Sequence, residues 1–268
     1  MKPSVIRAIA LKDLRESAGS SQVLAPVLIV PLIFVVGYPV GLLVGLRYMS
    51  AADVAEFYAR IPLNVFPAVS GLTAQGKAAY IATAYLFSAF FLIIPTMMAT
   101  ILAANSFAGE KERHTLEGML YTPVSDTELV AGKIFGAVAP SIAFTWVCFA
   151  IYTVIVNVLG TPLVGVRYFP TPNWWVLMLL VVPAVAVFVT ALVVWVSARV
   201  STYQAANSIS GMVVLPIVLL VVGQASGVML AGPGVFAVLG IVLGLLDVLL
   251  MRWIARTFDR EKVVSSFL

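Results

Sequence analysis

Charged side chains are absent from five long stretches of the chain, and these stretches set its organisation. The stretches without Asp, Glu, Lys or Arg are residues 17–46, 78–109, 134–166, 168–198 and 200–246. A helix needs only about 20 apolar residues to cross the hydrocarbon core of a bilayer, and the last stretch has room for two helices. The pattern predicts transmembrane helices near residues 22–46, 80–106, 134–159, 174–198, 208–230 and 235–255.

The stretches are continuously apolar, which distinguishes helices from the strands of a membrane barrel. Barrel strands alternate lipid-facing and lumen-facing residues over about ten positions, and no such alternation is seen here. The chain is 62% hydrophobic and 10% charged, against roughly 45–50% and about 25% in a soluble domain. We therefore expect an all-α integral membrane protein with six transmembrane helices, forming a single transmembrane domain over residues 1–268.

A shorter, amphipathic pattern precedes the first predicted span. Its apolar positions recur at helical spacing and are Val5, Ile6, Ile9, Ala10 and Leu14, with Arg7, Lys12, Asp13 and Arg15 between them. Such a pattern predicts a helix that lies in the membrane interface. A solvated cytoplasmic segment is the alternative. Charges continue through Glu16, which argues against a cleaved signal peptide.

Lys and Arg are distributed unequally between the two sides of the predicted bundle. With the N-terminus inside, the inner segments hold twelve of these residues and the outer segments hold four. The positive-inside rule then places both termini in the cytoplasm. The net charge of +4 is explained by this topology, so nucleic acid is not an expected partner.

Three smaller patterns bear on helix packing and on the interfaces. Glycines at four-residue spacing predict close helix contacts, and they are Gly37, Gly41 and Gly45, Gly223 and Gly227, and Gly240 and Gly244. Trp174 and Trp175 open the fourth predicted span and are typical of a membrane interface. The segment GLTAQGKA, residues 71–78, matches most of a phosphate-binding loop but ends in Ala78, which has no hydroxyl for Mg²⁺.

Candidate chemistry is sparse. His114 is the single histidine and Cys148 the single cysteine, so no metal site and no catalytic dyad is expected. Asp247 is the one acidic residue within a predicted span, and Gln224 and Ser226 are polar residues of the preceding span. These three residues form a possible intramembrane polar site. Asp247 could serve ion or substrate passage, or could pair locally near the cytoplasmic boundary.

The segment between the second and third spans, residues 109–133, holds eight of the 28 charged side chains. Leu116, Met119 and Leu120 recur there at helical spacing, which predicts a short amphipathic helix. Ser125 followed by Glu128 is a capping-box pattern and predicts the start of the next helix. Five acidic residues against three basic ones favour docking to a protein over docking to anionic lipid.

The stretch SFAGEKERHTLEGMLYTPVSDTELVAGK, residues 106–133, resembles the signature of the ABC-2 type transporter permeases. The resemblance lies in its alternating charges, Thr-Leu-Glu, Thr-Pro-Val-Ser and Gly-Lys. It implies a coupling helix that sits in a cleft of an ATP-binding subunit. The contact or relay residues implied are Glu110, Lys111, Glu112, Arg113, Thr115, Leu116 and Glu117.

The same resemblance implies the rest of the assembly. Two ATP-binding subunits would hydrolyse ATP with Mg²⁺, while this chain would be non-catalytic, bind no cofactor and pair with a second permease copy, identical or related. It would span the plasma membrane of a prokaryote, in contact with lipid, and export its cargo. Few fixed charges favour a hydrophobic or amphipathic cargo such as a drug, peptide or lipid-like molecule, although an ion stays possible. The alternatives are an ion-gradient-driven secondary transporter that uses Asp247, and a membrane sensor without transport.

Overall fold

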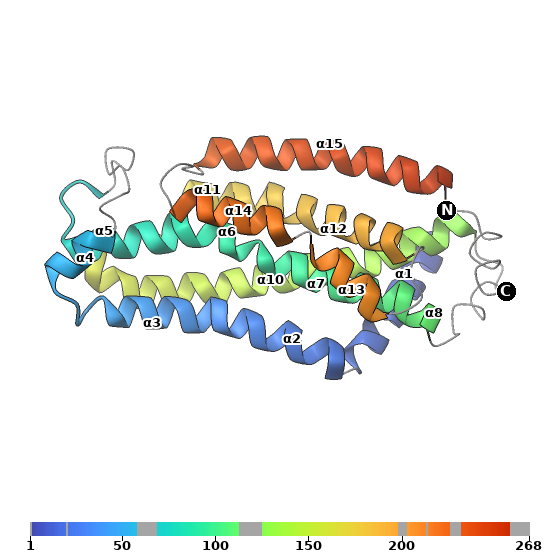
Figure 1. Cartoon of the computed structure of the whole chain (residues 1–268), viewed down its shortest axis with the longest axis horizontal. Helices are drawn as coiled ribbons and strands as arrows, with labels where there is room; N and C mark the ends of the chain where they lie inside the picture. Colours follow the sequence, from blue (N-terminus) through green and yellow to red (C-terminus); the bar gives the residue numbers. More distant parts are fainter. Residues whose placement is uncertain are drawn as a thin grey trace.

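The computed structural model describes residues 2–19, 21–57, 69–112, 125–197, 203–212, 214–225 and 232–257. All regular elements within these residues are helical, and most run along one long axis (Figure 1). Five helical stretches are long and apolar enough to cross a membrane: Ala25–Gly45, Ala74–Gly109, Glu128–Val164, Pro172–Ser197 and Pro233–Ile254. The predicted class of helical, multi-pass membrane protein is confirmed.

The count of six spans is not confirmed, because the predicted span at 208–230 is covered by two shorter helices. These are α13 (Tyr203–Gly211) and α14 (Val214–Ala225), and residues 213 and 226–231 lie outside the described part. Each helix has fewer than the roughly 20 residues that a span requires. The other five predicted spans each coincide with one of the long helical stretches.

Short helices and turns build several of these spans. The first consists of α2 (Ser21–Leu32), a π-helical turn (Ile33–Gly37) and α3 (Tyr38–Gly45), and α4 (Ala51–Phe57) follows it. The second consists of α5 (Ala74–Ile81), a π-helical turn (Ala82–Leu86), α6 (Phe87–Phe91), α7 (Ile93–Ala104) and a π-helical turn (Asn105–Gly109), and it runs into α8 (Glu110–Glu112). The later spans are α10 (Asp126–Val164), α11 (Pro172–Val176) with a π-helical turn (Leu177–Val181) and α12 (Val182–Ser197), and finally α15 (Pro233–Thr257).

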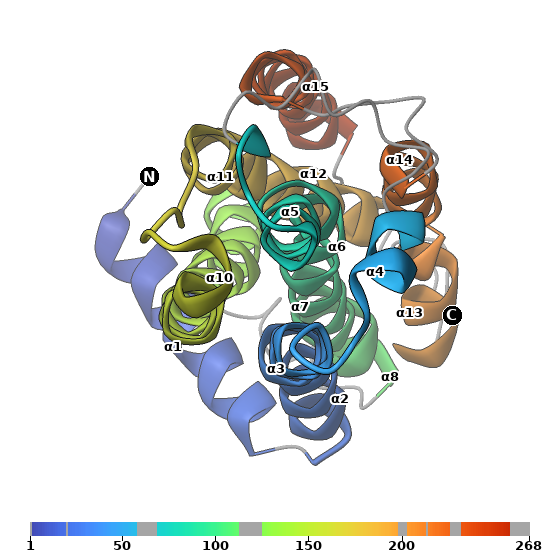
Figure 2. The ribbon, with the colours of Figure 1, turned by 90° about the vertical axis from the view of Figure 1, so that its left-hand side faces the viewer.

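The second span is the centre of the bundle. Within its most apolar window 78% of residues are buried inside the chain, against 28% for the first span and 17% for the last. Viewed along the bundle, α5, α6 and α7 are surrounded by α3, α10, α12 and α14 (Figure 2). A displacement of this span would therefore displace most of the helices packed around it.

An aromatic cluster fastens α10 and α11 to the π-helical turn Ala82–Leu86. Trp174 is fully buried, and its indole N–H donates a 2.9 Å hydrogen bond to the carbonyl of Ala84. The hydroxyl of Tyr152 donates a 3.1 Å bond to the carbonyl of Thr83. Since a π-turn leaves the regular α-helical ladder, its carbonyls can accept such side-chain bonds. Trp174 thus packs inside the bundle, while Trp175, the other predicted interfacial residue of this helix, is 45% exposed.

The N-terminal helix α1 (Pro3–Ala18) crosses one end of the bundle beside α10 (Figure 2). Of the predicted apolar face, Ile9 and Ala10 are buried there, whereas Leu14 is 37% exposed. Gly132 and Gly136 permit the contact, because an added Cβ would lie 2.9 Å from Ile9 Cβ and 3.1 Å from Ala10 Cα respectively. We call this end of the molecule the α1 end, and the opposite end, which carries α4, the α4 end (Figure 1).

Close contact is seen at one of the five ladder glycines whose surroundings the structure describes. A Cβ on Gly240 would lie 2.6 Å from Leu180 Cγ, whereas Cβ atoms on Gly37, Gly41, Gly45 and Gly244 would meet no atom within 4 Å. The ladder of the first span therefore faces away from the described part of this chain.

Candidate coupling site

The third span begins with the predicted capping box. Ser125 has an extended backbone, and its hydroxyl accepts a 3.3 Å hydrogen bond from the Glu128 N–H. One carboxylate oxygen of Glu128 accepts from the Ser125 N–H at 3.3 Å, and the other accepts from the Lys2 N–H at 2.6 Å. The start of α10 is thus capped and joined to the start of α1.

Further along α10, Lys133 reaches the end of the second span. Its ammonium donates to Glu110 Oε2 at 2.6 Å and to the Ser106 carbonyl at 2.5 Å, and it lies 5.2 Å from the ring centre of Phe107. The side chain of Lys133 is 0% exposed and that of Glu110 is 4% exposed. This is a buried ion pair between the first and last parts of the charged segment.

Helix α1 adds Lys12, Asp13 and Glu16 to this ion pair. Together with Ser106, Glu110 and Lys133 they form what we call the ionic cluster. Lys12 Nζ donates to Glu110 Oε1 at 2.5 Å and lies 3.3 Å from Glu16. Asp13 accepts from the Ser106 hydroxyl and lies 3.5 Å from Lys133 Nζ. Asn105 donates to Ser17 at 3.1 Å beside the cluster. Asp13 therefore turns inward, away from the polar face expected for it.

Burial and charge oppose each other within the ionic cluster. Burial raises the pKa of Asp13 above its usual range, although Lys133 and the Ser106 hydroxyl act to lower it. Burial disfavours the Lys12 ammonium, but the hydrogen bond to Glu110 and the nearby carboxylates outweigh this and leave the pKa of Lys12 raised. Lys12 thus stays cationic, while a proton on Asp13 is less unfavourable than in water.

The carboxylates of Asp13, Glu16 and Glu110 approach one another within 4.8 Å, a spacing that metal ligands also show. Lys12 and Lys133 already contact these carboxylates. Their two ammonium groups neutralise most of the charge that a cation would neutralise. The arrangement is accordingly explained by ion pairing.

The ionic cluster closes the base of the charged segment. Glu110 stands where the segment leaves the second span, and Lys133 stands where it enters the third, so their ion pair joins its two ends directly. Lys12 attaches α1 to the same carboxylate. A force applied to the intervening residues would therefore reach the second span, α10 and α1 together.

Three of the seven predicted coupling residues, Glu110, Lys111 and Glu112, lie within the described residues. Glu110 is buried and Glu112 is exposed, while Lys111 belongs to α8 but has no described side chain. The predictions at Arg113, Thr115, Leu116 and Glu117, and the predicted amphipathic helix, lie outside the described residues. The partners of Glu110, Lys12 and Lys133, were not anticipated from the sequence, and neither was the contact of Asp13 with Ser106 and Lys133. The one local signal is the position of Glu110 and Lys133, each directly beside a long apolar run at an end of the charged segment.

The possible intramembrane polar site is only partly described. Asp247 of α15 is 7% exposed, and its Oδ1 has no hydrogen-bond partner among the described residues. Arg252 is exposed and forms no ion pair with Asp247 within 4.0 Å. Gln224 lies in α14 without a described side chain, and Ser226 lies outside the described residues. The grouping of these three residues therefore stays a prediction.

The fold and the ionic cluster define a multi-pass helical membrane protein with an anchored, charged segment at one end. Residues 7–249 match the family described as ABC-2 family transporter protein, and the chain belongs to this family. It is thereby a transmembrane subunit of an ABC transporter, a kind of subunit that is generally non-catalytic. None of the curated proteins compared with the chain matches it.

Proposed function

We propose that this chain is the permease of an ATP-driven exporter, that a separate subunit hydrolyses ATP, and that the charged segment after Glu110 docks to that subunit. The observation that carries the proposal is the Glu110–Lys133 ion pair at the base of the segment. A loop that is joined to its bundle only by flexible chain would not transmit a displacement to the helices. Here the two ends of the segment are joined by a buried ion pair, so a displacement can be transmitted. In this proposal Glu110 is a relay, and the exposed Glu112 belongs to the contact surface.

The proposed complex contains two permeases and two ATP-binding subunits, with ATP and Mg²⁺ bound in the latter. The chain crosses the plasma membrane of a prokaryote with both termini in the cytoplasm, so the α1 end faces the ATPase. The cargo is hydrophobic or amphipathic, because Asp247 and Arg252 are the only Asp, Glu, Lys or Arg residues within the predicted spans.

Co-purification tests the proposal. A tagged full chain isolated from its own membrane should retain an ATP-binding subunit and ATPase activity, and reconstituted vesicles should accumulate cargo only when ATP is supplied on the α1 side. The chain alone should hydrolyse no ATP. Transport that survives ATP depletion and collapses when an ion gradient is dissipated would contradict the proposal.

That contrary result would identify a secondary transporter, for which the buried Asp247 carboxylate is the specific supporting observation. The variant Asp247→Asn separates the two functions. An exporter should keep transport within a few-fold in the protein that folds, while an ion-coupled transporter should lose transport at full expression.

A further inference from the structure

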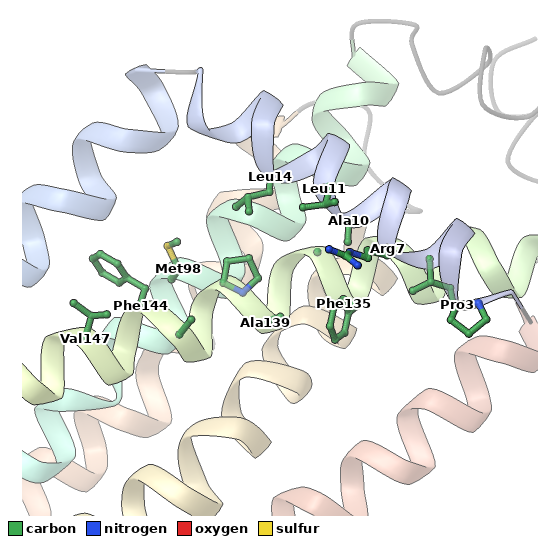
Figure 3. Close-up of a pocket in the computed structure, with 14 residues that line it drawn as sticks. Pro3, Arg7, Ala10, Leu11, Leu14, Met98, Phe135, Ala139, Phe144 and Val147 are labelled. Carbon is green, nitrogen blue, oxygen red and sulfur yellow. The ribbon is translucent and has the colours of Figure 1, made fainter.

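An apolar groove opens on the side of the bundle where α1 crosses α10 (Figure 3). Its volume is about 940 Å³, and its walls include Leu11 and Leu14 of α1 and Phe135, Phe144 and Val147 of α10. Phe135 is 55% exposed and Val147 is 56% exposed, so no described part of the chain covers them. The groove is thus open on the outer surface of the described part of the bundle.

Arg7 is the one charged residue that lines the groove among the described residues. Its side chain is exposed, lies among the apolar side chains between α1 and α10 (Figure 3), and has no ion-pair partner in the described part of the chain. Lys12 and Asp13 of the same helix are engaged in the ionic cluster. A guanidinium in this setting suits a phosphate, because its planar N–H groups match phosphate oxygens in pairs.

The groove has the length of one bilayer leaflet. From Phe135 to Val147 the wall on α10 rises by about 18 Å at about 1.5 Å per residue. One half of a hydrocarbon core about 30 Å thick is about 15 Å. Val147 also lies near the middle of the predicted span 134–159, and Phe135 lies near its charged end. The groove therefore extends from one interface to the midplane.

We propose that this groove is a binding site for an anionic glycerophospholipid, with one acyl chain along α10 and the phosphate group on Arg7. An apolar wall alone would bind the acyl chain of any lipid. Arg7, a cation at the interfacial end with no ion-pair partner in the described part of the chain, selects for a negative headgroup. The lipid would support α1 on the face opposite the ionic cluster. Such binding requires a membrane-embedded chain and does not depend on the ATPase partner.

Native mass spectrometry of the purified full chain tests the site. The chain in detergent is given phosphatidylglycerol or phosphatidylcholine in equal amounts, and the retained lipid is counted. The wild type should retain one phosphatidylglycerol in preference to phosphatidylcholine. Arg7→Gln should lower phosphatidylglycerol retention about five-fold, which is about 1 kcal/mol for one basic residue at an anionic surface. Arg7→Lys should restore most of it, which excludes a folding defect as the cause.

Two matched controls separate the site from general effects. Arg252→Gln removes an exposed cation near the C-terminal end of α15, outside the groove, and should leave retention unchanged. Ala143→Trp fills the groove and should reduce retention of both lipids, whereas Ala150→Trp, on α10 but outside the groove, should not. Equal losses for Arg7→Gln and Arg252→Gln, or wild-type retention by Ala143→Trp, would overturn the proposal.

Disulfide formation distinguishes lipid from a second copy of the chain in the groove. In a Cys148→Ala background, Ala143→Cys should give no covalent dimer in phosphatidylglycerol vesicles under oxidising conditions. A dimer formed in high yield through this cysteine would show that another chain covers the groove, and would overturn the lipid assignment.

Discussion

The side chain of Lys133 has no exposed surface. Its ammonium group donates hydrogen bonds to three oxygen atoms, and these bonds offset the cost of burying the charge. Lys133→Met should leave Glu110 and Asp13 buried with less compensating charge. Removal of one partner from a buried ion pair costs about 3–5 kcal/mol, so the melting temperature should fall markedly. The double variant Lys133→Met with Glu110→Gln should recover part of the loss, because it removes the uncompensated carboxylate.

The control for that series is Lys77→Met at the α4 end, where no ion pair is seen among the described residues. The melting temperature of Lys77→Met should stay close to that of the wild type. Surface substitutions away from buried contacts usually change the free energy of unfolding by no more than about 0.5 kcal/mol. Equal melting temperatures for Lys133→Met and Lys77→Met would contradict the buried ion pair.

Asp13 should make stability depend on pH in an identifiable direction. Burial raises the pKa of Asp13 in the folded protein above the ordinary value of 3.8. The stability that follows from this raised pKa is fully present below pH 3.8, and it is lost as the pH rises through the folded-state pKa. The Asp13→Asn variant has no carboxyl group to ionise at this position, so it does not lose this stability as the pH rises. Lys12, Lys133 and Glu110 are retained in both proteins and act as a common background.

Melting temperatures of the two proteins in detergent, measured from about pH 4 to about pH 7, check the direction of this effect. The melting temperature of Asp13→Asn, relative to that of the wild type, should rise across this range. A constant difference, or one that moves the other way, would show that ionisation of Asp13 is not penalised in the folded state.

Among the elements, the contact of α1 with α10 depends on the small size of two glycines. Gly136→Val should force α1 outward, because an added Cβ at this position meets the backbone of Ala10 at 3.1 Å and backbone cannot rotate away. Overpacking of this kind costs about 1–3 kcal/mol. We expect a lower melting temperature and faster tryptic cleavage at Arg7 and Arg15.

Gly244→Val is the matched control, since a Cβ there meets no atom within 4 Å among the described residues. The Gly244→Val variant should keep the melting temperature and the rate of tryptic cleavage of the wild type. If Gly136→Val also cleaves and melts like the wild type, α1 is not held against α10 as the structure shows.

The elements were largely predictable from local pattern, because long apolar runs and a capping box determine helices without knowledge of tertiary contacts. Ser125 and Glu128 form the expected capping box at the start of α10. The partners within the bundle were less predictable. Charge in α1 indicated a polar face, yet Asp13 is buried, since its carboxylate meets Lys133, which lies 120 positions later. Long-range pairing of this kind leaves no periodic trace in the sequence.

At the scale of the whole molecule, the central second span ends at the base of the charged segment. Its π-helical turn Asn105–Gly109 is buried, and Glu110 follows directly in the ionic cluster. The same span is the most buried of the five, so displacement at Glu110 would be transmitted along its length to the helices around it. The ATPase contacts expected within residues 113–124 stay a prediction, because these residues lie outside the described part of the chain.

A double substitution in the segment tests whether it transmits ATP-driven motion. Glu112→Ala with Glu117→Ala should leave the bundle folded, because Glu112 is exposed and exposed substitutions usually stay within about 0.5 kcal/mol. Loss of charged contacts in a partly desolvated cleft of a partner can instead cost a few kcal/mol, which is tens- to hundreds-fold in affinity. We expect a normally inserted permease that loses its ATPase or hydrolyses ATP without transport.

Melting temperature, ATPase retention and transport should be measured together for this double variant and for Lys133→Met. The first should have a normal melting temperature with failed coupling, because it changes only the contact surface. The second should have a lowered melting temperature, because it breaks the base of the segment. If the double variant retains its ATPase and transports normally, the segment is a surface feature, and coupling must pass through a different part of the permease.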